Sequence, residues 1–185
     1  MEQRGTATKD KEEARHTPGP TSRALFSHLI QFEIEENYFE LLRSNVLSKV
    51  DPGRDRKRHL YFERVLKTPD ARMVLAIIWK ESPYVTAADL SAAGLSKTYD
   101  TSELTSHGLA VHLATTPRDV SKLNSKVRTI GLAAEHFGLI TKRKLGSTRT
   151  VLEGTALLHD LMKALGESNI STIRRLTATI EDLPN

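Results

Sequence analysis

Apolar residues recur at helical spacing over residues 21–50, where positions such as Leu25, Leu29 and Phe32 follow one another at intervals of three or four. The pattern ends at Asp51-Pro52-Gly53, because Pro interrupts a helix and Gly permits a positive φ. A helix of about 30 residues is about 45 Å long, more than one side of a small domain covers. We therefore expect this segment to pack against a second copy of the chain.

The middle of the chain predicts further helices. Residues 59–67 have the pattern of a short amphipathic helix. Thr68-Pro69-Asp70 is typical of a helix start, because Thr caps, Pro suits the first turn and Asp favours the positive end of the helix dipole. The helix that follows, up to Glu81, is dense in apolar residues and should be the central core helix. Residues 86–94 predict another short helix and residues 95–102 a loop.

Two helices separated by a sharp break come next. Residues 103–113 predict a short helix, and Ala114-Thr115-Thr116-Pro117 breaks the chain and restarts it, with Thr116 as a suitable N-cap. The second helix, residues 117–137, has apolar positions in one continuous stripe. Its opposite face mixes small hydroxyl groups with cations: Arg118, Ser121, Lys122, Ser125, Lys126, Arg128 and Thr129.

A short β-hairpin follows this helix. Gly138 ends the helix, residues 139–144 alternate like a strand, Gly146-Ser147 supplies a turn, and residues 148–152 form a β-branched return strand. Two more apolar helical patterns, at 157–165 and at about 170–183, complete the chain. We expect these last helices to join residues 21–50 in a dimer interface.

The order of short helix, turn, longer helix, basic hairpin and helix resembles the winged helix-turn-helix of bacterial transcription regulators. The resemblance is carried by GLAVHLATTPRDVSKLNSKVRTIGLAAEHFGLI at 108–140, and by TRTVLEGTALLHDLMKAL at 148–165, which looks like the wing return and next helix of MarR-type regulators. It implies a mainly α fold with a small β-hairpin wing and flanking dimerisation helices. The expected units are a disordered tail (1–20), N-terminal dimerisation helices (21–67), a winged helix-turn-helix domain (68–155) and C-terminal dimerisation helices (156–185).

Charge is concentrated on the part that such a fold presents to DNA. Residues 117–149 carry eight cations and two acids, a net charge of +6, while the whole chain carries +4. Cations that contact duplex DNA release its counterions and make binding strongly salt-dependent. About six such contacts give a log–log salt slope of roughly −5.

The resemblance implies a sequence-specific DNA-binding transcriptional regulator, a homodimer that reads two half-sites about 34 Å apart on double-stranded DNA. Helix 117–137 would enter the major groove, and wing 139–152 would follow the backbone or minor groove. We expect base contacts from Arg118, Ser121, Lys122 and Ser125. We expect phosphate contacts from Thr115, Thr116 and Lys126, and wing contacts from Lys142, Arg143, Lys144 and Arg149.

Other functional classes find less support. The chain has no Cys, which excludes disulfides and thiol chemistry. No spacing of Ser, His or acids indicates an enzyme, a cofactor or a metal site, and His107 and His112 are five apart, which does not place them on one helical face. No apolar run is long enough for a membrane span and no secretory signal is evident, so we expect a soluble cytoplasmic protein without a membrane partner.

Two alternatives remain open. The winged helix is also used as a protein–protein interaction module in a larger assembly. A regulator of this kind can also bind a small effector, an apolar molecule lodged between the dimer helices and the winged domain.

Overall fold

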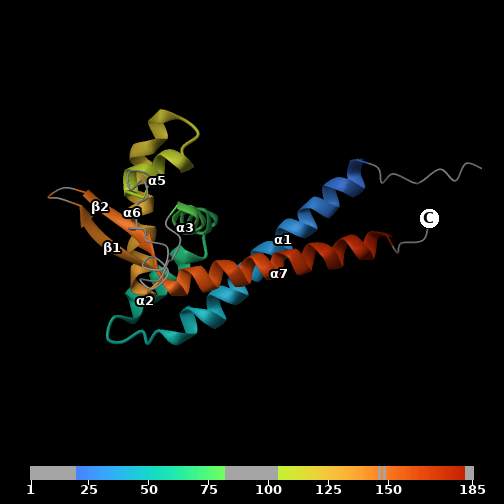
Figure 1. Cartoon of the computed structure of the whole chain (residues 1–185), viewed down its shortest axis with the longest axis horizontal. Helices are drawn as coiled ribbons and strands as arrows, with labels where there is room; N and C mark the ends of the chain where they lie inside the picture. The colour runs from blue at the N-terminus through green and yellow to red at the C-terminus, as the bar shows by residue number, and fades with distance from the viewer. Residues whose placement is uncertain (1–19, 82–103, 146, 148, 182–185) are drawn as a thin grey trace, which may run out of the picture.

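The structure, a computed structural model, describes residues 20–81, 104–145, 147 and 149–181. It is mainly helical with one two-stranded antiparallel hairpin, which confirms the predicted mainly α class with a small hairpin (Figure 1). The described elements are α1 (Pro20–Asn45), α2 (Arg56–Leu66), α3 (Pro69–Glu81), α5 (Ser106–Leu113), α6 (Val120–His136), β1 (Ile140–Leu145), β2 (Arg149–Gly154) and α7 (Ala156–Glu181), with 3-10 turns at Leu47–Lys49 and Pro117–Asp119.

The molecule has a head and an arm. The head comprises α2, α3, α5, α6 and the hairpin, together with the halves of α1 and α7 nearest to them. The arm comprises residues 20–37 of α1 and 169–181 of α7, which run antiparallel and extend away from the head. Figure 1 shows the arm on the opposite side of the head from the hairpin. Elements distant in the sequence are thus paired, since α1 opens the described chain and α7 closes it.

The head is built around one apolar core. Side chains from α1, α2, α3, α5, α6, both strands and α7 contribute to it, and many are inaccessible to solvent. Tyr38 of α1 joins the core through its hydroxyl, which donates to the Leu66 carbonyl oxygen at 2.8 Å, and burial raises the pKa of this phenol above its usual range. The largest fully buried side chains include Leu42, Leu66, Leu75, Ile78, Leu109, Ile130, Phe137 and Leu158.

Local signals in the sequence account for several boundaries. The Thr68 hydroxyl accepts from the Ala71 amide at 3.3 Å at the start of α3, as its position before Pro69 predicted. Gly53 has φ +58° and Gly138 has φ +73°, so both predicted stops use the conformation that glycine favours. The first helix ends earlier than expected, at Asn45, and a 3-10 turn covers the remaining residues before Asp51.

Two expectations differ from the structure. The segments 157–165 and 170–183 belong to one helix, α7, because no proline separates them and α1 packs along its length. The short helix expected at 103–113 begins at Ser106, because the preceding backbone pairs with β2 instead. Residues 56–66 form α2, which packs in the head against α6, and their expected place among the dimerisation helices stays a prediction.

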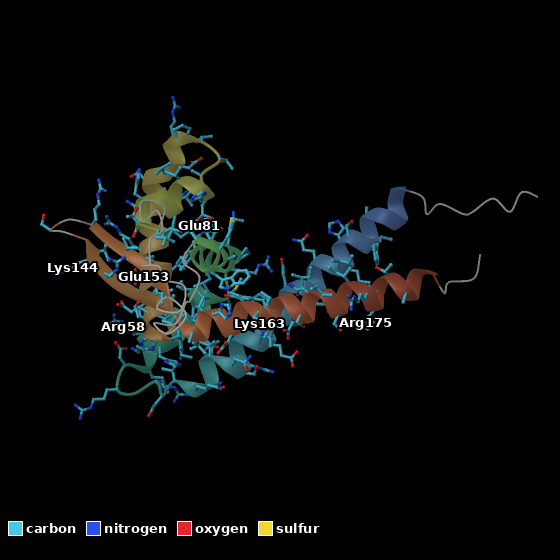
Figure 2. The ribbon with its side chains drawn as sticks, in the orientation of Figure 1. Arg58, Glu81, Lys144, Glu153, Lys163 and Arg175 are labelled. Atoms are coloured by element: carbon cyan, nitrogen blue, oxygen red, sulfur yellow. The ribbon has the colours of Figure 1, made fainter. Side chains whose placement is uncertain are left out.

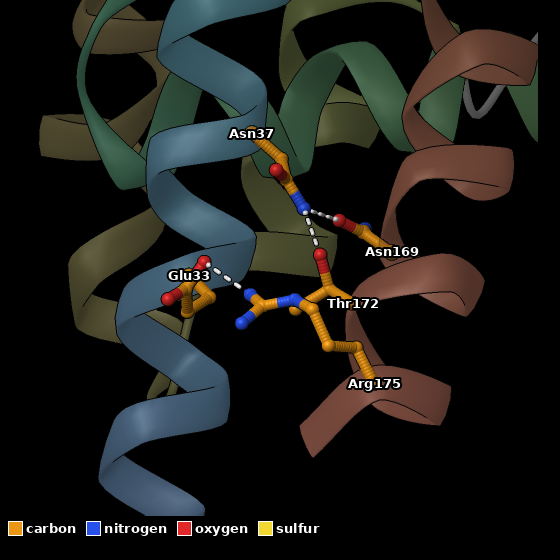
Figure 3. A network of polar contacts seen from close by, with 5 residues as sticks. All are labelled: Glu33, Asn37, Asn169, Thr172 and Arg175. Atoms are coloured by element: carbon orange, nitrogen blue, oxygen red, sulfur yellow. Dashed lines mark hydrogen bonds and ion pairs between the residues drawn. The ribbon is translucent and has the colours of Figure 1, made fainter. Parts of the chain in front are cut away.

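Polar side chains join the two helices of the arm (Figure 3). The Asn37 amide nitrogen donates to Asn169 Oδ1 at 3.1 Å and to Thr172 Oγ1 at 3.0 Å. One turn further out, Arg175 Nη2 lies 3.2 Å from Glu33 Oε2. Thr172 is buried, so its hydroxyl needs this partner. These contacts tie α1 to α7 in one register.

Several sequence predictions lie outside the described residues: the tail, apart from Pro20, the short helix at 86–94, the loop at 95–102, Gly146 in the hairpin turn and the end of the chain at 182–185. No helix in the described ranges is both long and apolar enough to cross a membrane.

Candidate nucleic-acid interface

The region predicted as a helix-turn-helix consists of two helices joined by a turn: α5, the 3-10 turn Pro117–Asp119, and α6. The Thr105 side chain caps α5 by accepting from the Gly108 amide at 3.1 Å. Pro117 begins the 3-10 turn that leads into α6, as expected for a residue with a fixed φ at a helix start. On the inner side, Val127, Ile130 and the alanines of α6 are buried against α5 and α2. This packing fixes which face of α6 remains accessible.

The accessible face of α6 carries an uninterrupted row of polar and cationic side chains. Residues 121, 122, 125 and 128 of α6 are exposed and their spacing places them on one side of the helix, and residue 118 of the preceding 3-10 turn is also exposed. Within the described part of the chain no carboxylate forms an ion pair with the cations of this row, Arg118, Lys122 and Arg128. We call these residues the α6 row: Arg118, Ser121, Lys122, Ser125 and Arg128. It contains all four residues that we expected to contact bases.

The two threonines expected to hold phosphates contact a carboxylate instead. The hydroxyls of Thr116 and Thr115 donate to Asp119 Oδ2 at 2.6 and 3.3 Å. The Thr116 hydrogen bond is the main reason why the pKa of Asp119 lies below its usual range, and Lys122 lowers it further. The start of α6 therefore presents one ionised carboxylate beside the α6 row, and both hydroxyls are engaged by it. Thr116 makes no side-chain cap to the backbone, although its position predicted one.

Lys126 lies at the edge of this face. Its ammonium group pairs with Asp70, at the start of α3. The pair is partly exposed, so it contributes little to stability, but it directs the lysine toward α3 and away from the α6 row. A phosphate contact from Lys126 would have to replace this pair.

The hairpin is anchored to the helix-turn-helix at two points. The Leu152 amide donates to the Leu104 carbonyl oxygen at 3.0 Å, and Thr105 forms an isolated bridge with Val151. On the other side, β2 lies so close to α6 that a Cβ at Gly131 would meet Leu152 Cδ1 at 3.3 Å. The hairpin thus has a defined orientation relative to α6.

Two of the four hairpin cations are paired with carboxylates. Lys142 Nζ lies 2.5 Å from Glu135 Oε2 of α6, and Arg143 Nε lies 2.7 Å from Glu153 Oε1 of β2. Lys144 and Arg149 are exposed, and no ion pair joins them to other described residues. Figure 2 shows Lys144 toward the outer end of the hairpin and Glu153 nearer its base.

A cleft lies between α6, the hairpin and the first turn of α5. Its volume is about 700 Å³, and it is lined by Arg128, Asn124, Lys142, Arg149 and other residues from these three elements. The sequence pattern assigned no role to Arg128 or Asn124. The sequence does show that Asn124 and Arg128 are four residues apart, on the polar side of the apolar stripe of this helix. It does not show which edge of the helix faces the hairpin, and this is why neither residue was assigned to a site.

Within the described ranges, no group of three or more His, Asp or Glu side chains is arranged to hold a metal ion. No protein-family model, curated protein or solved structure matches the chain, so the functional conclusion rests on the geometry of the α6 row, the hairpin and the cleft between them.

Proposed function

We propose that this protein is a winged helix-turn-helix transcriptional regulator that binds double-stranded DNA in a sequence-specific manner in the cytoplasm. The observation that carries the proposal is that Arg128, at one end of the α6 row, borders the same cleft as the hairpin cations Lys142 and Arg149, so that a helix and a cationic hairpin lie side by side. A helix fits the major groove of B-DNA, and cations on a neighbouring projection match the flanking phosphates. The pairing of β2 with the start of α5 holds the two parts in a fixed relation.

Each part of the surface has its own role in this proposal. Arg118, in the 3-10 turn, and Ser121, Lys122 and Ser125, in the first turns of α6, are exposed and would contact base edges, where Arg and Lys recognise guanine. Lys144 and Arg149 would contact the backbone or minor groove from the hairpin. Asp119 is flanked by cations, and its exposed carboxylate is suited to the amino group of cytosine.

The arm supports a homodimer. Leu25 and Phe32 of α1 are 67% and 59% exposed, and Leu29, Ile170 and Ile173 are also exposed, although all belong to a pair of helices with few other neighbours. The part of α1 in the arm, residues 20–37, is about 27 Å long, so a face two helices wide offers roughly 500 Å² to a second copy of the chain. A second copy of this chain brings the same apolar side chains, and two-fold symmetry would place two α6 helices on one duplex.

The direct test combines a selection of bound duplexes with a double variant. Wild-type protein should enrich a defined sequence from random duplexes at a stated salt concentration. Arg118→Ala with Lys122→Ala should weaken binding to that sequence by at least tenfold, because each base-contacting pair contributes about 1–3 kcal/mol. Lys49→Ala with Lys163→Ala removes the same charge from exposed positions outside this face and is the matched control. Equal affinities for the two double variants would reject the assignment of α6.

A second candidate is a winged-helix module that binds another protein. It is favoured by Leu132, which is 42% exposed on the same side of α6, one turn beyond Arg128. In that case no duplex is enriched, and Leu132→Ala, rather than the loss of Arg118 and Lys122, should weaken the interaction with the protein partner.

A further inference from the structure

The cleft between α6 and the hairpin has the size of a small-molecule site. Its volume of about 700 Å³ falls within the range of about 300–1,000 Å³ that is usual for ligand pockets. The lining combines apolar surface from Leu152 and Gly131 with polar groups from Ser106 and the strands. A single backbone phosphate fills only a small part of such a volume.

The side chains that line the cleft carry a net positive charge, which favours an anionic ligand. Arg128, Lys142 and Arg149 line it, and none of the described lining residues is acidic. Glu135 compensates Lys142 at 2.5 Å, which leaves two guanidinium groups, those of Arg128 and Arg149, without an ion pair in the described part of the chain. Guanidinium groups bind phosphate in a bidentate manner, and a phosphate monoester carries a charge of about −1.5 to −2 at pH 7. A monoester therefore matches the uncompensated charge.

The side chain of Asn124 adds a second requirement. Its Oδ1 atom is buried and accepts no hydrogen bond from the described residues, an arrangement that is unfavourable if nothing satisfies it. Asn124 lines the cleft, so a rotation of its side chain toward the cleft would let a bound molecule supply the missing donor. A phosphodiester of the DNA backbone has acceptor oxygens and no donor, so it does not satisfy Oδ1. A molecule that carries a hydroxyl or amino group beside its phosphate does.

We propose that this cleft binds a small phosphate monoester that also carries a hydroxyl or amino donor, with a nucleoside 5′-monophosphate as the representative ligand. The phosphate lies between Arg128 and Arg149, and the donor reaches Asn124. Because Arg128 belongs to the α6 row and Arg149 to the hairpin, the bound ligand neutralises two cations of the surface assigned to DNA. Ligand and DNA therefore compete, a consequence that rests on the proposed function, whereas ligand binding itself does not.

Titration of the 185-residue chain with three compounds separates the contribution of the phosphate from that of the hydrogen-bond donor. AMP supplies phosphate and donors, sulfate supplies a dianion without donors, and adenosine supplies donors without charge. Calorimetry at low salt should show saturable AMP binding, weaker sulfate binding and no adenosine binding. Arg128→Gln with Arg149→Gln should weaken AMP binding by at least tenfold, whereas Lys49→Gln with Lys163→Gln should not change it. Asn124→Ala should weaken AMP binding while leaving sulfate binding unchanged, which reduces the preference for AMP.

Two results would overturn the site: no saturable AMP binding at millimolar concentrations, or equal AMP affinity in the Arg128→Gln/Arg149→Gln variant and its control. The competition is tested separately with the selected duplex, whose apparent Kd should rise in proportion to AMP once AMP exceeds its own Kd. An unchanged duplex Kd at saturating AMP would overturn competition alone. If the wild type binds AMP as described but enriches no duplex, the proposed function fails and the ligand site stands.

Discussion

The head and the arm of this protein use helices in different ways. In the head, side chains from eight elements meet in one core, and residues such as Leu66 and Ile130 are almost completely shielded from solvent. In the arm, two helices contact mainly each other, hold their register with polar side chains and leave large apolar residues exposed. A two-helix pair has only one inner face on which to bury apolar surface. We therefore expect the head to be stable by itself, and the exposed apolar residues of the arm support the proposal that it packs against a second chain.

The largest effect is expected in the head core. Leu66→Ala should lower the free energy of unfolding by about 2–5 kcal/mol, because it removes fully buried methyl groups and leaves a cavity. Urea unfolding followed by circular dichroism measures this loss, which should not depend on protein concentration. An effect below 1 kcal/mol, or one that grows on dilution, would mean that the head is not independently stable.

The next largest effect concerns self-association through the arm. Phe32→Glu should raise the dimer dissociation constant by at least 100-fold, about 2.7 kcal/mol, because it places a charge in the proposed interface. Analytical ultracentrifugation over a range of concentrations measures the change. Leu60→Glu makes the same kind of substitution at an exposed residue of the head and is the control. Similar association of wild type and Phe32→Glu would contradict the dimer.

A smaller effect is expected from the polar contact within the arm. Asn37→Ala should cost about 1–2 kcal/mol, because the buried Thr172 hydroxyl and the Asn169 amide lose their partner. Gln31→Ala, which removes an exposed side chain from the same helix, should leave stability within about 0.5 kcal/mol of wild type. Thermal unfolding of the two variants compares them directly, and equal stability would mean that the Asn37 contacts do not hold the arm.

The smallest effect is a pH dependence in the head. His59 Nδ1 and His136 Nε2 lie 3.1 Å apart beside Phe137, and burial, aided by His59 and Arg58, holds the pKa of His136 below its usual value, whereas Asp55 opposes the shift. The unfolded chain then binds this proton more readily than the folded chain. The contribution of neutral His136 to the free energy of unfolding should be fully present above about pH 6.5 and should decrease as the pH falls below this value.

The measurement is the Tm from pH 7.5 down to pH 5. His136→Gln should flatten the curve relative to wild type over this interval. A wild-type Tm that rises on acidification would contradict the lowered pKa, and an identical slope in the variant would assign the dependence to other groups.

Several features of the fold and the site followed from short-range patterns. The apolar stripe of α6, the start of α3 at Pro69 and the alternation of the hairpin depend on neighbours within one or two turns, and all are present. The α6 row followed from the same periodicity, because residues that share one helical face remain together in any fold. The continuity of α7 was missed, because packing against α1 overrides a break that the local pattern suggested.

The charge pattern along the sequence did not predict which cations are paired with carboxylates in the folded chain. Counting charges over 117–149 predicted a strongly cationic surface, but two carboxylates outside this window, Asp70 and Glu153, pair with Lys126 and Arg143. The number of cations was correct, but the positive potential of the surface was overestimated. A carboxylate that is distant in the sequence neutralises a cation as well as an adjacent one does, once folding brings the two together.

The order of residues was sufficient to define the helices, the hairpin and the cationic face of α6, because each depends on spacing along the backbone. Three features are consequences of three-dimensional packing: the pairing of α1 with α7, the buried oxygen of Asn124, and the lack of an ion pair at Arg128 and Arg149 among the described residues. They arise from contacts between segments that no local periodicity relates, and these contacts determine which charges remain available to a ligand.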